Sequence, residues 1–499
     1  MAQEHKTLKE LQRVRRQKLD ELRELGHNPY PYSYPVTHHS GQLQGMNDSQ
    51  FPEEVAIAGR VVSLRKMGKA SFAHLQDHRG RQQIYVKRDL VGEETYRDLF
   101  GRVDLGDYLG VQGRVFRTKT GEITVEAAQL QLLAKSLRPL PGVKEKDGTA
   151  FDSFDDKEQR YRRRYLDLVV NPEVRDIFIQ RAKVIRHMRE FMDGDGFVEV
   201  ETPALQPVYG GASARPFTTF HNTLDQTLYL RIADELYLKR LIIGGFDRVY
   251  EIAKNFRNEG MDKNHNPEFT SLEYYWAYAD YNDGMDLTES LVRSVAKQMD
   301  SLTLTYHGNE IDLKSKFRRQ DYFELLSKHS GVDLNELTSD DQLRTIAEDR
   351  GLALEPNLNY GQVLGKLFDQ LVEPHLVQPT FVVDYPKAIS PLAKIHRSGN
   401  PALVERFELF IAGMEFANAF SELNDPLDQR ERLEAQSELR AAGDEEAQVV
   451  DEDFLEAMEY GMPPMAGVGI GVDRLVMLLT GQESIKDVIL FPAMRPRQP

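Results

Sequence analysis

Residues 248–280 constrain the fold of this chain most strongly, because they read as two strands joined by a polar loop. Alternation along the first strand places two side chains on one face, Arg257 and Glu259. Alternation along the return strand places three on one face, Phe269, Glu273 and Tyr275. Together with His265 in the loop, they combine an arginine, carboxylates and aromatic rings. Such a set indicates a cup for an anion, a ring and a cation. The alternative is a hairpin exposed on the surface.

Length and composition exclude several classes of protein. The 499 residues are too many for one ordinary core and predict two or three domains. No apolar run approaches the length that crosses a membrane, and the first residues lack the apolar core of a signal peptide. Without cysteine, the chain has no disulfide, thiolate metal site or cysteine nucleophile. We therefore expect a soluble cytoplasmic protein with no membrane partner.

Charge is unevenly distributed along the chain. The formal net charge of −16 at first argues against a nucleic-acid partner. Residues 55–90, however, are rich in lysine and arginine, whereas residues 422–459 are acidic. A local phosphate-binding face is therefore compatible with the overall acidity.

The N-terminal part of the chain predicts a helix and a small barrel. Leucines at near-heptad spacing predict one helix over residues 1–26, and an extended linker follows to residue 50. This helix either docks on a neighbouring domain or clamps an RNA backbone. Residues 51–145 read as about five short strands with glycine-bearing turns, typical of an oligonucleotide-binding (OB-fold) barrel. Side chains suited to reading unpaired bases are Arg65, Phe72 and Gln83, although Phe72 is alternatively ordinary barrel core.

Residues 146–499 mix strand and helix patterns and predict a second, larger domain. Within it, residues 301–378 have mostly helical periodicity and little that suggests chemistry, so they predict a helical insertion. The fold class is therefore α+β, with a five-stranded barrel before a domain built on an antiparallel sheet.

Residues 407–425 predict a second hairpin that turns near residues 412–413 and brings Glu408 close to Glu415. Two carboxylates on one face repel each other, and a hard divalent cation such as Mg²⁺ relieves the repulsion. Residues of the opposite parity are Asn418, Phe420 and Glu422. If all five face one site, a bulge lies between Glu415 and Asn418. A solvent-facing acidic hairpin is the alternative.

The stretch GVGIGVDRLVMLL at residues 467–479 predicts a strand with one face of bare backbone, followed by a helix. The alternating glycines are Gly467, Gly469 and Gly471, and Arg474 lies in the first turn of the helix. An arginine at a helix N-terminus favours phosphate, and the bare face admits a flat ring. We interpret the stretch as a nucleotide site, with a glycine strand used only for tight packing as the alternative.

Two further motifs complete the candidate site. Residues 210–217, GGASARPF, supply a flexible loop that contains Gly211. Glu235 begins a helix, where it alternatively serves only as a capping carboxylate. With Glu273 and Glu422, it gives three acidic groups available to a small cationic substrate.

Taken together, these motifs resemble the class II lysyl-tRNA synthetases of the bacterial type over nearly the whole chain. FVEVETP, FRNEG…HNPEFTSLEYY and GVGIGVDRL resemble the three signature motifs of that class, while GGASARPF, ELYLKRL and ANAFSELNDP resemble its lysine-specific additions. The resemblance implies an OB-fold anticodon domain, a class II catalytic domain and a homodimer. The implied reaction joins L-lysine to tRNA(Lys) through a lysyl-adenylate, releasing AMP and pyrophosphate from ATP. The alternatives are a ligase that lysylates a protein and a non-catalytic RNA-binding paralogue.

The resemblance also assigns roles to individual residues. For ATP, with Mg²⁺ as cofactor, it implies Arg257, Glu259, His265, Phe269, Gly471 and Arg474, of which Arg257 and Arg474 are catalytic. For the metal it implies Glu408 and Glu415. For lysine it implies Gly211, Glu235, Arg257, Glu273, Tyr275, Asn418, Phe420 and Glu422. For the anticodon it implies Arg65, Phe72 and Gln83.

Overall fold

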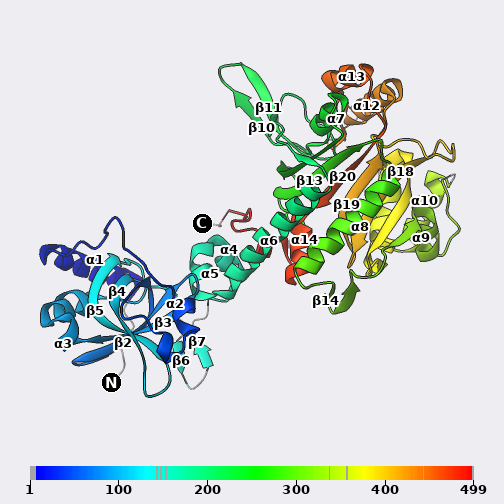
Figure 1. Ribbon diagram of the computed structural model, residues 1–499. Helices are drawn as coiled ribbons and strands as arrows, with labels where there is room; N and C mark the ends of the chain where they lie inside the picture. The colour runs from blue at the N-terminus through cyan, green and yellow to red at the C-terminus, as the bar shows by residue number, and fades with distance from the viewer. Residues whose placement is uncertain are drawn as a thin grey trace. The chain divides into compact units, whose positions relative to one another are not determined.

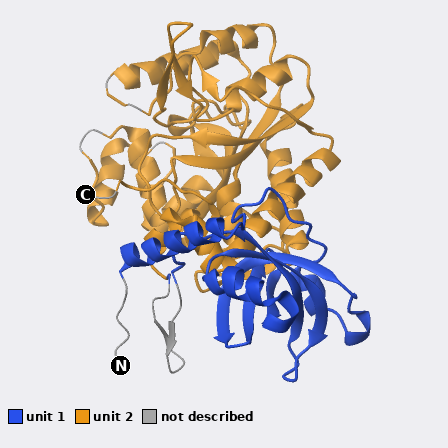
Figure 2. Cartoon of the chain, turned by 90° about the vertical axis from the view of Figure 1, so that its left-hand side faces the viewer, with its two compact units in different colours: residues 1–154 blue, residues 155–499 orange. Residues whose placement is uncertain are grey.

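A computed structural model describes residues 7–141, 144–146, 149–151, 154–336, 338–355, 358–441, 443–444 and 446–496. The chain divides into two compact units, Met1–Phe154 and Asp155–Pro499 (Figure 2). The boundary between these units falls nine residues after the one that we predict between 145 and 146. No helix in the described residues is both long and apolar enough to span a bilayer.

The first unit is built on a closed five-stranded barrel with strand order β1-β2-β3-β5-β4, which confirms the predicted OB-fold type (Figure 1). Its strands are β1 (Val55–Met67), β2 (Ala70–Asp77), β3 (Gly80–Lys87), β4 (Tyr108–Arg117) and β5 (Ile123–Ala134). Buried and half-exposed residues alternate along them, so one face of each strand fills the barrel with apolar side chains. A short pair, β6 (Lys144–Lys146) and β7 (Thr149–Phe151), follows.

Helix α1 (Leu8–Glu24) docks on this unit. A capping box between Thr7 and Glu10 fixes its start. Arg15, buried at 8% exposure, donates to the carbonyl oxygens of Ser136 and Leu105 at 3.1 and 2.9 Å. These contacts support the docking role over the RNA clamp. The other helices of the unit are α2 (Ser40–Gln44) and α3 (Arg88–Val91).

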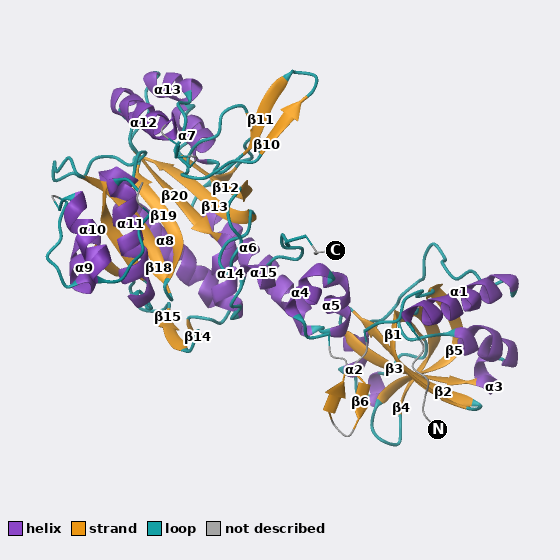
Figure 3. Ribbon diagram, turned by 180° about the vertical axis from the view of Figure 1, so that it is seen from behind, coloured by secondary structure: helices purple, strands orange, loops and turns teal. Residues whose placement is uncertain are grey.

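The second unit is organised by an eight-stranded sheet with the order β16-β17-β18-β19-β20-β13-β12-β8 (Figure 3). All neighbours are antiparallel except β16/β17 and β12/β8. The strands are β8 (Val198–Glu199), β12 (Arg248–Phe256), β13 (Glu268–Ala277), β16 (Arg318–Asp321), β17 (Thr380–Pro386), β18 (Leu403–Ile411), β19 (Met414–Ser421) and β20 (Met465–Gly471). Outside the sheet lie β9 (Leu205–Gln206), β10 (Thr218–His221), β11 (Gln226–Leu230), β14 (Thr303–Tyr306) and β15 (Asn309–Asp312).

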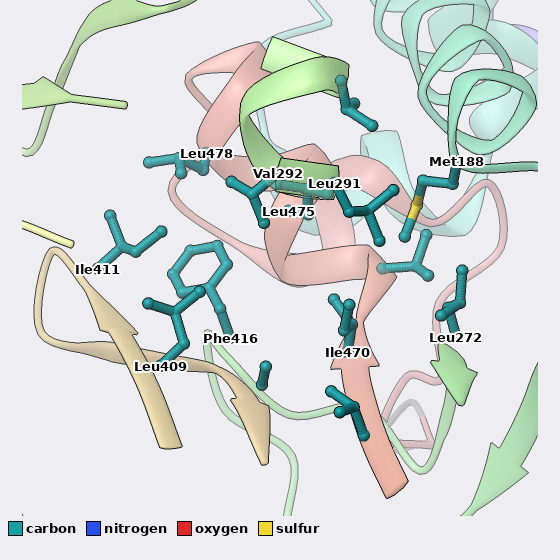
Figure 4. Close-up of a cluster of buried hydrophobic side chains, with 14 of the residues drawn as sticks. Met188, Leu272, Leu291, Val292, Leu409, Ile411, Phe416, Ile470, Leu475 and Leu478 are labelled. Carbon is teal, nitrogen blue, oxygen red and sulfur yellow. The ribbon is translucent and has the colours of Figure 1, made fainter. Parts of the chain in front are cut away.

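Helices cover the sheet and leave its glycine-bearing strand open to a cavity. The α-helices in the described part of this unit are α4 (Lys157–Arg162), α5 (Arg164–Val170), α6 (Glu173–Gly194), α7 (Glu235–Ile243), α8 (Tyr281–Gln298), α9 (Tyr322–Ser330), α10 (Asp340–Asp349), α11 (Tyr360–Leu371), α12 (Pro426–Ala441), α13 (Glu452–Glu459), α14 (Val472–Thr480) and α15 (Ile485–Val488). The main core lies where α6, α8 and α14 meet the sheet, as Figure 4 shows with Met188, Leu291 and Leu475 beside Ile470 and Phe416.

The predicted helical insertion at 301–378 is wrong in its first part. Residues 301–321 contain β14, β15 and β16, and only then do α9, α10 and α11 follow. The strands are four residues long, which is too short for an alternating pattern to be recognised. β16 also pairs with β17, so this segment extends the central sheet and is not a separate helical module.

Candidate functional site

A cavity of about 1230 Å³ in the second unit gathers the predicted residues. Predicted site residues in its wall are Gly211, Glu235, Arg257, Glu259, His265, Phe269, Glu273, Tyr275, Glu408, Glu415, Asn418, Phe420, Gly471 and Arg474. Of the residues predicted for this unit, only Glu422 lies outside that wall. Motifs that are up to about 260 residues apart in the sequence therefore converge on one space.

The β12/β13 hairpin forms one side of the cavity. Its register pairs Asn255 with Phe269, as a regular antiparallel ladder requires. The strand ends at Phe256, so Arg257 and Glu259 lie in the loop and not on the predicted strand face. Arg257 nevertheless turns toward the return strand, with its guanidinium carbon 5.1 Å from the centre of the Phe269 ring. An arginine head and an aromatic face thus line the same part of the cavity.

The loop of the hairpin reaches the helix that follows the glycine strand. Nη2 of Arg474 lies 3.2 Å from Nε2 of His265, whose Nδ1 lies 2.8 Å from a carboxylate oxygen of Asp262. Arg474 also donates to the carbonyl oxygen of Glu415 at 2.5 Å. The contact between Arg474 and His265 places two basic side chains near the N-terminus of α14, where the helix dipole and the free backbone amides favour an anion.

The glycine strand β20 lies between β13 and β19. Gly469 pairs with Glu273 on one side and Asn418 on the other, while Gly467 pairs with Tyr275 and Phe420. The glycines therefore form a bare floor flanked by functional side chains. Gly467 has no room for a side chain, because an added Cβ would lie 2.1 Å from Oε1 of Glu422 and 2.3 Å from the Tyr275 ring.

The β18/β19 hairpin carries the predicted acidic pair. It turns at residues 412–413 with Phe410 opposite Glu415, and its register shifts so that Leu409 pairs with Ala417. The shift is the predicted bulge. It leaves Glu415, Asn418 and Phe420 on the half-buried face. The predictions of turn, pairing and bulge are confirmed.

Glu408 and Glu415 have the chemistry of a hard-cation site. Burial raises the pKa of Glu408 to about 7, with the charge of Glu415 adding to the effect and Arg406 and Tyr385 opposing it. Burial also raises the pKa of the neighbouring Glu373 to about 8, and Asp369, Glu408 and Glu415 add to that shift. Glu408 and Glu415 fit Mg²⁺ by ligand type, because hard divalent cations prefer carboxylate oxygens. Glu408 also forms an ion pair with Arg406, and the described residues contain no group of three or more acidic, histidine or cysteine ligands that could hold a metal.

Glu422 lies against Gly467 on the side where a side chain of that residue would point, and it contacts Lys239, which was not predicted from the sequence. Its Oε2 lies 2.5 Å from Nζ of Lys239, which also contacts Oε1 of Glu235 at 2.5 Å. The side chains of Lys239 and Glu422 are completely buried. Burial raises the pKa of Glu422 against the opposing charge of Lys239. Oε1 of Glu422 has no hydrogen-bond partner among the described residues.

The contact between Lys239 and Glu235 could have been predicted from the sequence. It lies four residues after Glu235 in ELYLKRL, the spacing that stacks two side chains on one helical face. The helix therefore presents a carboxylate and an ammonium side by side. Glu235 is not a capping carboxylate here, because its charge is used in this buried pair.

In the barrel, the predicted base readers lie on the outward face of β2 and its neighbours. Arg65 pairs with Phe72 across β1/β2, and Phe72 lies 4.8 Å from the Tyr85 ring. The residues that flank Phe72 in the chain are buried while Phe72 is half-exposed, so Phe72 is not barrel core. Gln83 donates to Glu122 at 2.6 Å. An aromatic pair and an amide are thus available on one sheet face.

Comparison with known proteins agrees with this geometry. The family description "tRNA synthetases class II (D, K and N)" matches residues 156–495, and "OB-fold nucleic acid binding domain" matches residues 55–140. A lysine--tRNA ligase of Moorella thermoacetica is 54% identical over 98% of both chains. Those of Pelotomaculum thermopropionicum and Carboxydothermus hydrogenoformans are 54% and 52% identical, over 98% and 99% of this chain and 96% and 100% of theirs.

Proposed function

The chain belongs to the class II tRNA synthetases of the D, K and N group, and from this premise we propose that it joins L-lysine to tRNA(Lys) at the expense of ATP. Its relatives named lysine--tRNA ligase share more than half of its residues over nearly its full length. The observation that carries the proposal is a single cavity whose wall contains both arginines and buried carboxylates.

The first step is attack of the lysine carboxylate on the α-phosphorus of ATP. A P–O bond forms to the lysine carboxylate and the bond to pyrophosphate breaks, leaving lysyl-adenylate. Arg257 is proposed to bind both reacting anions, and Arg474 with His265 to hold the distal phosphates. The positions of Arg257 beside the Phe269 ring and of Arg474 beside His265 support these roles. These groups act by positioning and charge neutralisation, so no enzyme nucleophile is required. A ribose hydroxyl of tRNA then attacks the activated carbonyl and releases AMP.

The nucleoside of ATP is proposed to bind against the bare glycine floor. Phe269 supplies a ring for stacking on adenine, and Glu259 accepts from its exocyclic amine. Gly471 lies at the start of α14, where backbone amides point toward phosphate. The proximity of Arg257 to the Phe269 ring supports a shared base and α-phosphate region.

The lysine substrate is proposed to bind along β13 toward Glu422. Gly211 and Glu235 contact its α-amino group, and Glu273, Tyr275 and Glu422 contact the side-chain ammonium. Asn418 and Phe420 line the same pocket. The single ammonium of Lys239 offsets only part of the charge of Glu235, Glu273 and Glu422, so we expect the pocket to select a cationic side chain and to reject aspartate or a neutral isostere.

Glu408 and Glu415 are the residues that would hold Mg²⁺ in this site. The ion would neutralise charge on the triphosphate. Its proposed position rests on the mutual repulsion of the two carboxylates and on their place in the wall of the same cavity.

Two partner surfaces complete the proposal. Arg65, Phe72 and Gln83 on the barrel are proposed to read the anticodon by stacking and edge contacts. A second copy of the chain is proposed to pair through the segment that ends at Pro203. Val198 and Leu205 in this region are 48% and 47% exposed, which supports an interface there.

A lysine-dependent exchange of pyrophosphate into ATP tests the function, with aspartate and asparagine as competing substrates. We expect exchange with lysine and none with the other two. Exchange with aspartate, or RNA binding without any exchange, would instead support a different substrate or a non-catalytic paralogue. Lysylation of a protein is not favoured, because the anticodon-type barrel is present.

A further inference from the structure

Lys239 on α7 is a completely buried side chain that the proposed reaction does not use. Its Nζ lies 2.5 Å from Oε1 of Glu235, 2.5 Å from Oε2 of Glu422 and 5.9 Å from the centre of the Phe454 ring. Burial lowers the pKa of Lys239, but the two carboxylates together outweigh burial and raise that pKa above its ordinary value. The protein thus holds a fixed ammonium between two of the carboxylates that are proposed to bind lysine.

The ammonium of Lys239 acts on a bound substrate through these carboxylates and not by contact. Lys239 does not line the cavity, whereas Glu235 lies in the cavity wall. Glu235 is proposed to bind the α-amino group of lysine, and Glu422 the side-chain ammonium. One buried cation is therefore paired with the acidic groups for both ends of the substrate.

The two oxygens of Glu422 have different surroundings. Oε2 forms the ion pair with Lys239, whereas Oε1 lies beside Gly467 and the Tyr275 ring, both of which line the cavity. Oε1 has no hydrogen-bond partner among the described residues. A buried oxygen of this kind requires a donor, and a donor that enters the cavity beside Gly467 can supply one.

We propose that Lys239 is a positioning residue for lysine selection, which holds Oε2 of Glu422 and leaves Oε1 to the side-chain ammonium of the substrate. The charge of Lys239 also opposes the rise in the pKa of Glu422 that burial causes, and so favours the ionised form that attracts a cation. A neutral side chain gains nothing from that charge, so Lys239 increases the discrimination against neutral isosteres. This inference rests on the proposed lysine site.

Pyrophosphate exchange by full-length Lys239→Met tests this role, because methionine is close to lysine in length and carries no charge. Discrimination is measured as the inhibition constant of a neutral lysine analogue, with a hydroxyl in place of the side-chain ammonium, divided by KM for lysine. We expect discrimination to fall about 10- to 150-fold, while KM for ATP stays close to that of the wild type. Unchanged discrimination overturns the inference.

Lys135→Met is the matched control. Lys135 is also buried between two carboxylates, with Nζ 2.6 Å from Asp104 and 2.7 Å from Asp107, but it belongs to the first unit. The control loses the same kind of cation, and its discrimination should equal that of the wild type. A fall as large as that of Lys239→Met would reflect lost stability alone and would overturn the inference.

A double-mutant cycle with Glu422→Gln separates positioning from a purely structural role. In the Glu422→Gln background, Lys239→Met should change discrimination by less than about twofold, because the carboxylate through which Lys239 acts is gone. Effects through Glu235 on the α-amino group cancel, since lysine and the analogue share that group. If Lys239→Met alone does not fold, the double variant is compared with Glu422→Gln, and a larger change overturns the inference. Absence of lysine-dependent exchange in the wild type refutes the proposed function itself.

Discussion

Replacing Gly467 by alanine tests whether the glycine floor holds the lysine-binding carboxylate in place. The new Cβ would lie 2.1 Å from Oε1 of Glu422, whereas ordinary contacts begin near 3.4 Å. A neighbour must therefore move by about 1.3 Å. The Tyr275 ring would also lie only 2.3 Å from the new Cβ, so it too would have to move. Overpacking of this kind costs roughly 1–3 kcal/mol of unfolding free energy. Displacing the Glu422 side chain should weaken lysine binding by roughly 1.5–3 kcal/mol, which is about 10- to 150-fold in affinity.

Denaturant unfolding and pyrophosphate exchange measure the two effects separately. We expect Gly467→Ala to lower the unfolding midpoint and to raise KM for lysine, with a much smaller change for ATP. Gly469→Ala is the matched control for stability, because its Cβ would meet its nearest atom, Cγ of Glu273, at an ordinary 3.6 Å. A Gly467→Ala protein with wild-type stability and wild-type KM for lysine would refute the reasoning.

Three further predictions concern single side chains. Lys239→Met leaves Glu235 and Glu422 buried without their cation, so the free energy of unfolding, measured by denaturant titration, should fall by roughly 3–5 kcal/mol. A fall of less than about 1 kcal/mol would contradict the ion pairs of Lys239. Phe72→Ala should weaken binding of tRNA by about 1–3 kcal/mol in filter binding and leave lysine-dependent exchange unchanged; reduced exchange would argue for a structural role. Glu415→Gln should raise the Mg²⁺ concentration required for half-maximal exchange, and an unchanged requirement removes Glu415 from the metal site.

The features that the sequence predicted well are those fixed by strand parity and short turns. A two-residue turn at 412–413 sets which residues face each other, so the Phe410–Glu415 pairing and the bulge followed from counting. The glycine strand was equally predictable, because alternate glycines place no side chain on one face of the strand; that Glu422 and Tyr275 pack against this face at Gly467 was not.

The features that escaped prediction depend on contacts between distant segments. Arg257 lies past the end of its strand, and strand ends are set by tertiary packing and not by alternation. The contact between Lys239 and Glu422 joins α7 to the residue that follows β19. Charged residues at such positions look like surface residues in sequence. Only the fold reveals that they are buried together.

The proposed site binds ATP over the glycine strand and lysine against buried carboxylates in one cavity. Steady-state pyrophosphate exchange by Glu422→Gln, with KM determined for both substrates, tests this division most directly. The variant keeps the shape of the side chain and removes only its charge. We predict a large rise in KM for lysine with KM for ATP close to that of the wild type. An equal loss for both substrates would contradict the assignment of Glu422 to the lysine ammonium.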